Sequence, residues 1–142
     1  MNRWSSRPAP GEPDGLILFD GVCVFCSRWV RFVIDRDTQR RFRFVAIQSE
    51  AGRALAMRYG IDADTPQTNA VILDGRIWFK SDAALAVLSA LPSTRGLGML
   101  RAVPTPLRNP IYDLIAQNRY RIFGRTDACM VPSAEDRDRF IA

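Results

Sequence analysis

The chain has 142 residues, of which 47% are hydrophobic and 25% charged, and it carries a net charge of +5. This length suits one hydrophobic core and is too short for two full domains. The basic residues are scattered among 15 acidic ones, without the interleaved aromatic residues typical of nucleic-acid binding. No apolar run approaches the roughly 20 residues that span a bilayer, and a chain with three cysteines has no disulfide framework. We therefore expect a single cytoplasmic domain that binds no nucleic acid and has no membrane span.

The first 15 residues predict a flexible leader. They contain no apolar stretch of signal-peptide length, and prolines and glycines recur through their second half. After this leader we expect a single domain over residues 16–142. Its core would occupy about residues 16–91, a helical C-terminal extension about residues 96–124, and a polar tail residues 125–142.

The first part of the predicted domain consists of two strand–helix units. Residues 16–19 are apolar at every position, as in an inner strand covered on both faces. A helical pattern follows over about residues 24–36, and residues 42–47 predict a second strand. Ser49 can cap a second helix, which Gly60 would end. Right-handed crossovers would make the two strands parallel.

A hairpin and a third helix complete the predicted core. Residues 70–73 and 76–80 are apolar runs on either side of Asp74-Gly75, a dipeptide that favours a tight hairpin turn. Ser81 then caps a third helix, which Pro92 ends. The resulting order, β-α-β-α-β-β-α, predicts an α/β fold with a thioredoxin-like core and extra C-terminal helices.

The predicted extension is helical. Residues 99–103 favour a short helix, and Asn109 resembles an N-cap with Pro110 at the first helical position. The last helix would carry an apolar stripe made of Ile111, Leu114, Ile115 and Ile122. We expect this stripe to cover the core, although a partner-binding helix would have the same pattern.

The pair Cys23 and Cys26 is the strongest functional signal in the chain. It lies directly after the first predicted strand and its short turn, and directly before the first predicted helix. A helix N-terminus presents unpaired N–H groups and a partial positive charge, which favour the reactive thiolate. Cys23 could then attack a disulfide, and Cys26, one turn later, could resolve the mixed disulfide. The context predicts a redox dithiol.

Two other interpretations of these cysteines are open. They could be small buried hydrophobic residues in a tight turn, or they could contribute half of a zinc or iron–sulfur site. The chain contains no histidine and only one further cysteine, Cys129. A closed metal site would therefore need an acidic ligand or a second chain. We expect no metal and no cofactor beyond the redox-active Cys23–Cys26 disulfide.

The stretch from Leu18 to Cys26 resembles the DCC family of predicted thiol-disulfide oxidoreductases. The family is named for the Asp, Cys and Cys that are Asp20, Cys23 and Cys26 here. The resemblance extends over essentially residues 16–132. It includes the stretches Arg31-Phe32-Val33, Phe42-Arg43-Phe44, Gln48-Ser49, Ser81-Asp82-Ala83-Ala84-Leu85, Asn118-Arg119-Tyr120-Arg121 and Asp127-Ala128-Cys129. It implies a thioredoxin-like fold and disulfide reductase or oxidase activity.

Asp20 has two candidate roles. As part of Asp-Gly it suits the turn that leaves the strand. As a partly buried carboxylate it could also relay a proton to or from Cys26, as a general acid or base. Because the chain has no histidine, a carboxylate is the residue best suited to this work near the dithiol. One residue could serve both roles.

Three further sites are expected. Thr65-Pro66-Gln67 resembles the segment in which glutaredoxins place a substrate-holding cis-proline, and an ordinary trans-proline in a loop is the competing interpretation. Ser81 and Asp82 open the helix whose counterpart binds a glutathione carboxylate in glutaredoxins, and a plain N-cap would have the same sequence. Cys129 is either an inert thiol or an additional redox thiol.

The sequence as a whole predicts a thiol-disulfide oxidoreductase in which Cys23 attacks, Cys26 resolves and Asp20 assists proton transfer. Its partners would be a protein disulfide or a low-molecular-weight disulfide such as that of glutathione, together with a recycling reductase. The alternative is a non-catalytic thioredoxin-like module that binds a protein partner through its basic surface and last helix.

Overall fold

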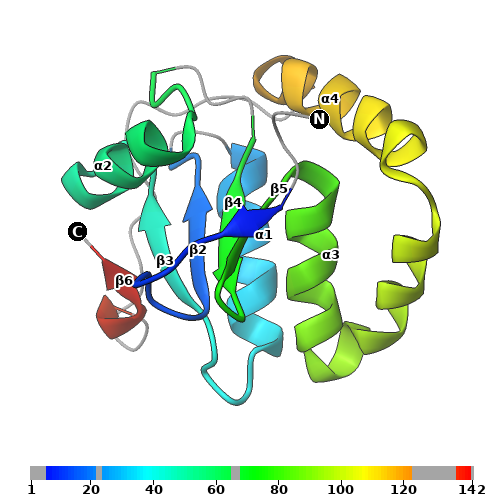
Figure 1. Cartoon of the computed structure of the whole chain (residues 1–142), viewed down its shortest axis with the longest axis horizontal. Coiled ribbons are helices and arrows are strands. Elements are labelled where there is room, and N and C mark those ends of the chain that lie inside the picture. The colour runs from blue at the N-terminus through cyan, green and yellow to red at the C-terminus, as the bar shows by residue number, and fades with distance from the viewer. Residues whose placement is uncertain (1–5, 22–23, 65–67, 123–136, 142) are drawn as a thin grey trace.

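The computed structural model describes residues 6–21, 24–64, 68–122 and 137–141. Figure 1 shows a mixed sheet with helices on both of its faces. The elements in chain order are β1 (Arg7–Pro8), β2 (Leu16–Phe19), α1 (Val24–Arg36), β3 (Arg43–Ala46), α2 (Glu50–Tyr59), β4 (Ala70–Leu73), β5 (Arg76–Phe79), α3 (Lys80–Ala90), the 3₁₀ helix η1 (Pro92–Ala102), α4 (Thr105–Ile122), the 3₁₀ helix η2 (Arg137–Arg139) and β6 (Phe140–Ile141).

The strands of the described part form one sheet in the order β1-β5-β4-β2-β3-β6. β2 and β3 are parallel, whereas β4 is antiparallel to both β2 and β5. The order from β2 to α3 is therefore the predicted β-α-β-α-β-β-α, and its parallel pair is confirmed. The protein has a thioredoxin-like α/β fold, with β1 and β6 added at the two edges of the sheet.

The central strands are apolar throughout because both faces of the sheet are covered. Leu16 and Leu18 of β2 join a core cluster with residues of α2, and Ile17 and Phe19 join a second cluster with residues of α1 and α3. Successive side chains of a strand point to opposite faces. A strand between two helical layers therefore has no polar position, as the sequence predicted.

The predicted caps of α2 and the predicted hairpin turn are confirmed. The Ser49 side chain accepts a hydrogen bond from the Gly52 N–H at 3.1 Å, and Gly60 ends α2 in the left-handed region at φ 82°. Asp74 and Gly75 both have positive φ, 55° and 79°. This backbone is the one that a two-residue hairpin requires.

The prediction that the first 15 residues form a flexible leader is wrong for the part that the structure describes. Arg7 and Pro8 form β1, which pairs antiparallel with β5, and Ala9 is buried. The Arg7 side chain lies over the rings of Tyr59 and Phe79 and donates a hydrogen bond to the Tyr59 carbonyl. Pro8 is tolerated because an edge strand leaves one side of its backbone without a partner strand.

The predicted start of the third helix is also wrong. α3 begins at Lys80, and its N-cap is Phe79, whose side chain makes no capping hydrogen bond. The first helical N–H, that of Lys80, instead donates to the Thr68 hydroxyl at 2.8 Å. A residue from a distant loop thus satisfies one of the N–H groups that a helix start leaves unpaired, and Ser81 lies inside the first turn.

The C-terminal extension differs from its prediction in three ways. A 3₁₀ helix occupies residues 92–102, where only a short helix over 99–103 was expected. α4 begins at Thr105, so Asn109 is not an N-cap and Pro110 lies inside the helix. Ile111, Leu114 and Ile115 of the apolar stripe, which was expected to cover the core, are exposed instead. Within the described ranges, no helix combines the length and the apolarity that crossing a bilayer requires.

Candidate functional site

The candidate site begins at the edge of the sheet where β2 and β3 both end. Their parallel register pairs Phe19 with Ala46, so the chain leaves the two strands side by side. Asp20 follows β2 directly and is buried, with 2% of its surface exposed. Gln48 lies two residues after the end of β3 and is a neighbour of Asp20. The sheet register therefore brings these two polar side chains together.

The side-chain amide of Gln48 bridges two consecutive residues of the turn between β2 and α1. Its Nε2 donates to Asp20 Oδ1 at 2.7 Å, and its Oε1 accepts from the Gly21 N–H at 2.8 Å. The two contacts fix the orientation of the Asp20 carboxylate and the path of the chain before the helix. The sequence patterns assign no role to Gln48. The available signal was topological, because the ends of adjacent parallel strands meet at one edge.

Cys26 lies in the first turn of α1 and is buried, with 9% of its surface exposed. α1 begins at Val24, the residue that follows Cys23, and Cys23 itself lies outside the described residues. Val30 and Val33 hold the helix against the sheet, with Trp29 and Phe32 partly buried beside them. The unpaired N–H groups and partial positive charge of a helix N-terminus, such as that of α1, favour the thiolate form of a cysteine located there.

The segment before β4 reaches the same edge of the sheet. The antiparallel register pairs Leu18 with Ala70, so the residues just before Ala70 lie near the residues just after Phe19. Thr68 is buried there and caps α3, as described above. Pro66, a predicted substrate-binding residue, lies outside the described residues. Its placement and its role stay predictions, as do those of Cys129, which is also outside them.

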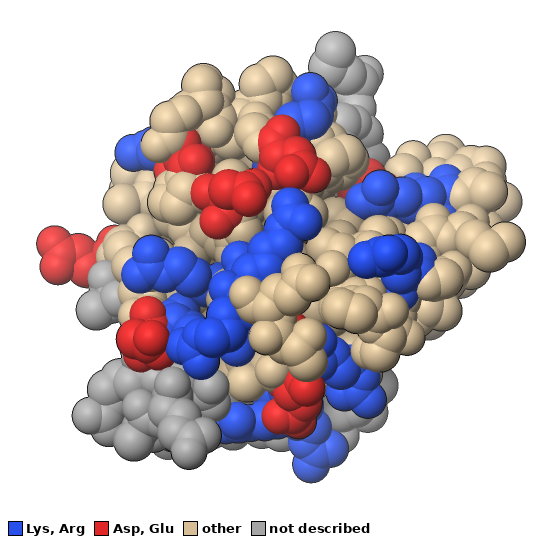
Figure 2. Space-filling model, turned by 90° about the horizontal axis from the view of Figure 1, so that it is seen from below, with Lys and Arg blue, Asp and Glu red and all other residues tan. Residues whose placement is uncertain are grey.

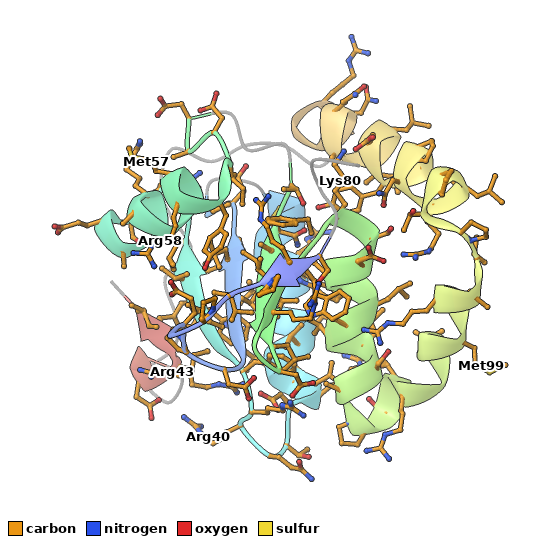
Figure 3. The ribbon with its side chains drawn as sticks, in the orientation of Figure 1. Arg40, Arg43, Met57, Arg58, Lys80 and Met99 are labelled. Carbon is orange, nitrogen blue, oxygen red and sulfur yellow. The ribbon has the colours of Figure 1, made fainter. Side chains whose placement is uncertain are left out.

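Ser81 and Asp82 lie at the start of α3 and are already engaged by α4. Arg108 Nη1 donates to the Ser81 hydroxyl and to Asp82 Oδ1, both at 2.9 Å. The Ser81 hydroxyl also bonds to Asn109. Figure 3 places Lys80 between the start of α3 and α4, where its ammonium pairs with an α4 carboxylate. A substrate carboxylate at this helix start would have to approach beside these contacts, and the proposed role of Ser81 and Asp82 stays a prediction.

No cluster of three or more histidine, cysteine or acidic side chains is arranged to hold a metal ion within the part of the chain that the structure describes. At this edge the structure brings together the Asp20 carboxylate and the Gln48 amide, and the Cys26 thiol belongs to the first turn of the helix that follows. A carboxylate can accept or donate a proton, an amide can orient that carboxylate through a hydrogen bond, and a thiol can exchange disulfides.

We expect the Gln48→Ala variant to lower the free energy of unfolding by about 1–3 kcal/mol, because it removes hydrogen-bond partners from the buried Asp20 carboxylate and from the Gly21 N–H. Urea unfolding followed by circular dichroism measures this change. Gln39 is exposed, so the control variant Gln39→Ala should stay within about 0.5 kcal/mol of the parent. An equally small effect in both variants would contradict the bridging role of Gln48.

Comparison with known proteins supports a redox assignment. Residues 17–125, well over half of the chain, match the family model of the DCC1-like thiol-disulfide oxidoreductases. The uncharacterized protein YuxK of Bacillus subtilis is 39% identical over 130 residues, which cover 91% of this chain and 95% of that protein. A chloroplastic DCC family protein of Arabidopsis thaliana is 39% identical over 116 residues, covering 80% of this chain and 67% of that protein. No solved structure matches. The matches confirm the family that the sequence resembles: the chain belongs to the DCC1-like thiol-disulfide oxidoreductase family.

Proposed function

We propose that the protein exchanges disulfides through a dithiol formed by Cys23 and Cys26. The observation that carries this proposal is the position of α1, which begins at the residue after Cys23 and holds Cys26 buried in its first turn. The helix start would stabilise the Cys23 thiolate. Family membership supports thiol-disulfide chemistry in general, and the assignment of these two residues is our own.

The proposed reaction with a disulfide substrate has two steps. The Cys23 thiolate attacks one sulfur of the substrate, forms a mixed disulfide and releases the other substrate sulfur as a thiolate, which takes up a proton. Cys26 then loses its proton and attacks Cys23 Sγ, so the mixed disulfide breaks and the second substrate sulfur leaves as a thiolate, which also takes up a proton. The substrate gains two electrons and two protons, and the enzyme is left with the Cys23–Cys26 disulfide.

We assign proton transfer at Cys26 to Asp20. Its carboxylate is buried at the end of β2 and held by Gln48, and it belongs to the turn that leads into α1. A buried, oriented carboxylate close to the dithiol turn is suited to accept the Cys26 proton during resolution and to return it when the disulfide is reduced.

The partners in this proposal are those expected from the sequence. The substrate is a protein or low-molecular-weight disulfide, glutathione included, and a separate reductase restores the dithiol. Pro66, Ser81 and Asp82 would contact the substrate, Cys129 would be an additional redox thiol, and the reaction would need no metal or other cofactor. A cytoplasmic location, where thiols are kept reduced, suits this cycle.

A trapping experiment tests the proposal. The Cys26→Ser variant should accumulate a mixed disulfide between Cys23 and its substrate, because the resolving thiol is gone. The double variant Cys23→Ser/Cys26→Ser should trap nothing. In the reduced parent protein, iodoacetamide should label Cys23 much faster than the buried Cys26. A non-catalytic binding module would give no Cys23-linked adduct and no reversible dithiol couple, and that result would refute the proposed function.

A further inference from the structure

α4 packs against the rest of the protein through polar side chains. Arg108 bonds to Ser81 and Asp82, and Asn109 also bonds to Ser81. Further along the helix, the Tyr112 hydroxyl bonds to the side chain and the backbone N–H of Asn69, and Asp113 pairs with Lys80 at 2.6 Å. A surface helix ordinarily turns its apolar stripe toward the core. The inward face of α4 is instead its polar one.

The apolar face of α4 points to solvent. Leu107, Ile111, Leu114 and Ile115 follow the i, i+4, i+7, i+8 spacing of one helix face. They are between 43% and 64% exposed. Arg121 is exposed, and the same 100° step per residue places it on this face, toward the C-terminal end of α4. The helix is therefore inverted relative to the usual arrangement, and its hydrophobic surface has no partner within the described chain.

η1 extends this surface away from α4. Leu97, Met99 and Leu100 are exposed, Met99 to 81%, and Val103 in the connection to α4 is also exposed. Figure 1 shows η1 and α4 forming the outer edge of the molecule beside α3, and Figure 3 places Met99 at the tip of this edge. We call the exposed apolar side chains of residues 97–115 the η1–α4 ridge. Single exposed apolar residues are normal, but eight in nineteen consecutive residues indicate a docking surface.

The segment that carries the ridge is basic. Residues 92–122 contain five arginines and a single acidic residue, Asp113, which gives a net charge of +4 out of +5 for the whole chain. Asp113 is paired with Lys80 on the inward face of α4. Arg95 and Arg101 of η1 and Arg121 of α4 are exposed. Seen from below in Figure 2, the projecting part of the molecule on the right is tan and blue, so basic side chains lie there among uncharged residues.

We propose that the η1–α4 ridge docks the protein onto a membrane surface that contains anionic lipids. Aliphatic side chains on a projecting helix can enter the boundary between headgroups and acyl chains, and arginines beside them attract anionic headgroups. A second copy of the chain would bring two surfaces of the same positive charge together, which opposes association through this face. Docking leaves the candidate redox site unchanged, so the membrane-bound protein keeps the proposed thiol chemistry.

Vesicle co-sedimentation of the full chain tests this proposal. We expect the parent protein to bind vesicles of phosphatidylcholine and phosphatidylglycerol in equal parts, to bind pure phosphatidylcholine vesicles much more weakly, and to be released as the salt concentration rises. The Ile111→Gln/Leu114→Gln variant should bind about a hundredfold more weakly, because it replaces two aliphatic side chains that enter the apolar boundary of the membrane. Both residues are exposed, and glutamine is a good helix former, so the fold should be retained, as circular dichroism can confirm.

Two exposed methionines provide a matched control. Met99 lies on the ridge, whereas Met57 belongs to α2 on the opposite side of the molecule and is 83% exposed. Met99→Gln should weaken vesicle binding and Met57→Gln should leave it unchanged. The proposal is overturned if the parent protein does not bind anionic vesicles, or if the Ile111→Gln/Leu114→Gln variant binds them as the parent does. It is also overturned if light scattering finds a parent dimer that this double variant converts to a monomer, since the ridge would then be an interface between copies.

Discussion

We expect the Asp20→Asn variant to resolve a mixed disulfide at Cys23 about 10²–10⁴-fold more slowly than the parent protein. The carboxylate that we assign to the Cys26 proton is buried and accepts a 2.7 Å hydrogen bond from Gln48. Asparagine keeps the shape of the side chain and its preference for turns, and it retains an oxygen that can accept from Gln48. It cannot take up a proton at neutral pH. The substitution therefore tests proton transfer more than folding.

Single-turnover stopped-flow kinetics separates the two steps of the reaction. The initial attack by Cys23 should keep most of its rate in Asp20→Asn, while the release of the second substrate thiol should slow. Asp35 lies near the other end of α1 and is exposed, so Asp35→Asn should leave both steps unchanged and serves as the charge-matched control. If resolution by Asp20→Asn stays within about twofold of the parent, Asp20 has no general acid–base role of this size. It would then be a turn residue.

Elements with local signals could be predicted from the sequence. The uniformly apolar residues 16–19 form an inner strand, Ser49 caps α2, and the Asp74-Gly75 dipeptide forms the hairpin turn. Each of these signals lies within a few residues of the structure that it determines. Propensity, capping and turn geometry act over that range.

Elements whose partners are distant in the sequence could not be predicted in this way. β1 exists because Arg7 pairs with Ile77 of β5. The start of α3 depends on the Thr68 hydroxyl, twelve residues earlier. The orientation of α4 depends on polar contacts with residues around Asn69 and Ser81, and hydrophobic periodicity alone predicts the opposite orientation. Tertiary contacts decide these features, and local patterns do not record them.

The sequence nominates residues for the candidate site but does not give its geometry. Asp20, Cys23 and Cys26 are apparent from the motif and from its place between strand and helix. The burial of Asp20 and its hydrogen bond to Gln48 depend on the parallel pairing of β2 with β3. A motif of neighbouring residues cannot reveal a side chain that reaches the site from the next strand.

We also expect the Asp37→Ala variant to lose about 3–5 kcal/mol of unfolding free energy, because it leaves a buried guanidinium without its counter-charge. Asp37 accepts hydrogen bonds from the backbone N–H groups of Arg41 at 3.0 Å and Phe42 at 2.8 Å, and it pairs with Arg139. Both charged side chains are buried. Arg139 also donates to the Phe42 carbonyl at 3.1 Å and 3.2 Å. This cluster attaches η2 and β6 to the connection between α1 and β3.

The same two segments of chain supply a matched control for this prediction. Arg40 and Asp138 are the neighbours of this cluster and pair at 2.9 Å, but their side chains are 50% and 75% exposed. Water and salt screen such a pair, so Asp138→Ala should cost no more than about 1 kcal/mol. If Asp37→Ala does not fold well enough to measure, Asp37→Asn keeps an oxygen acceptor and should show a smaller loss of about 1–3 kcal/mol. Urea unfolding at neutral pH measures all three variants. If the buried and the exposed carboxylate prove equally dispensable, the Asp37–Arg139 pair does not hold the C-terminal strand to the sheet.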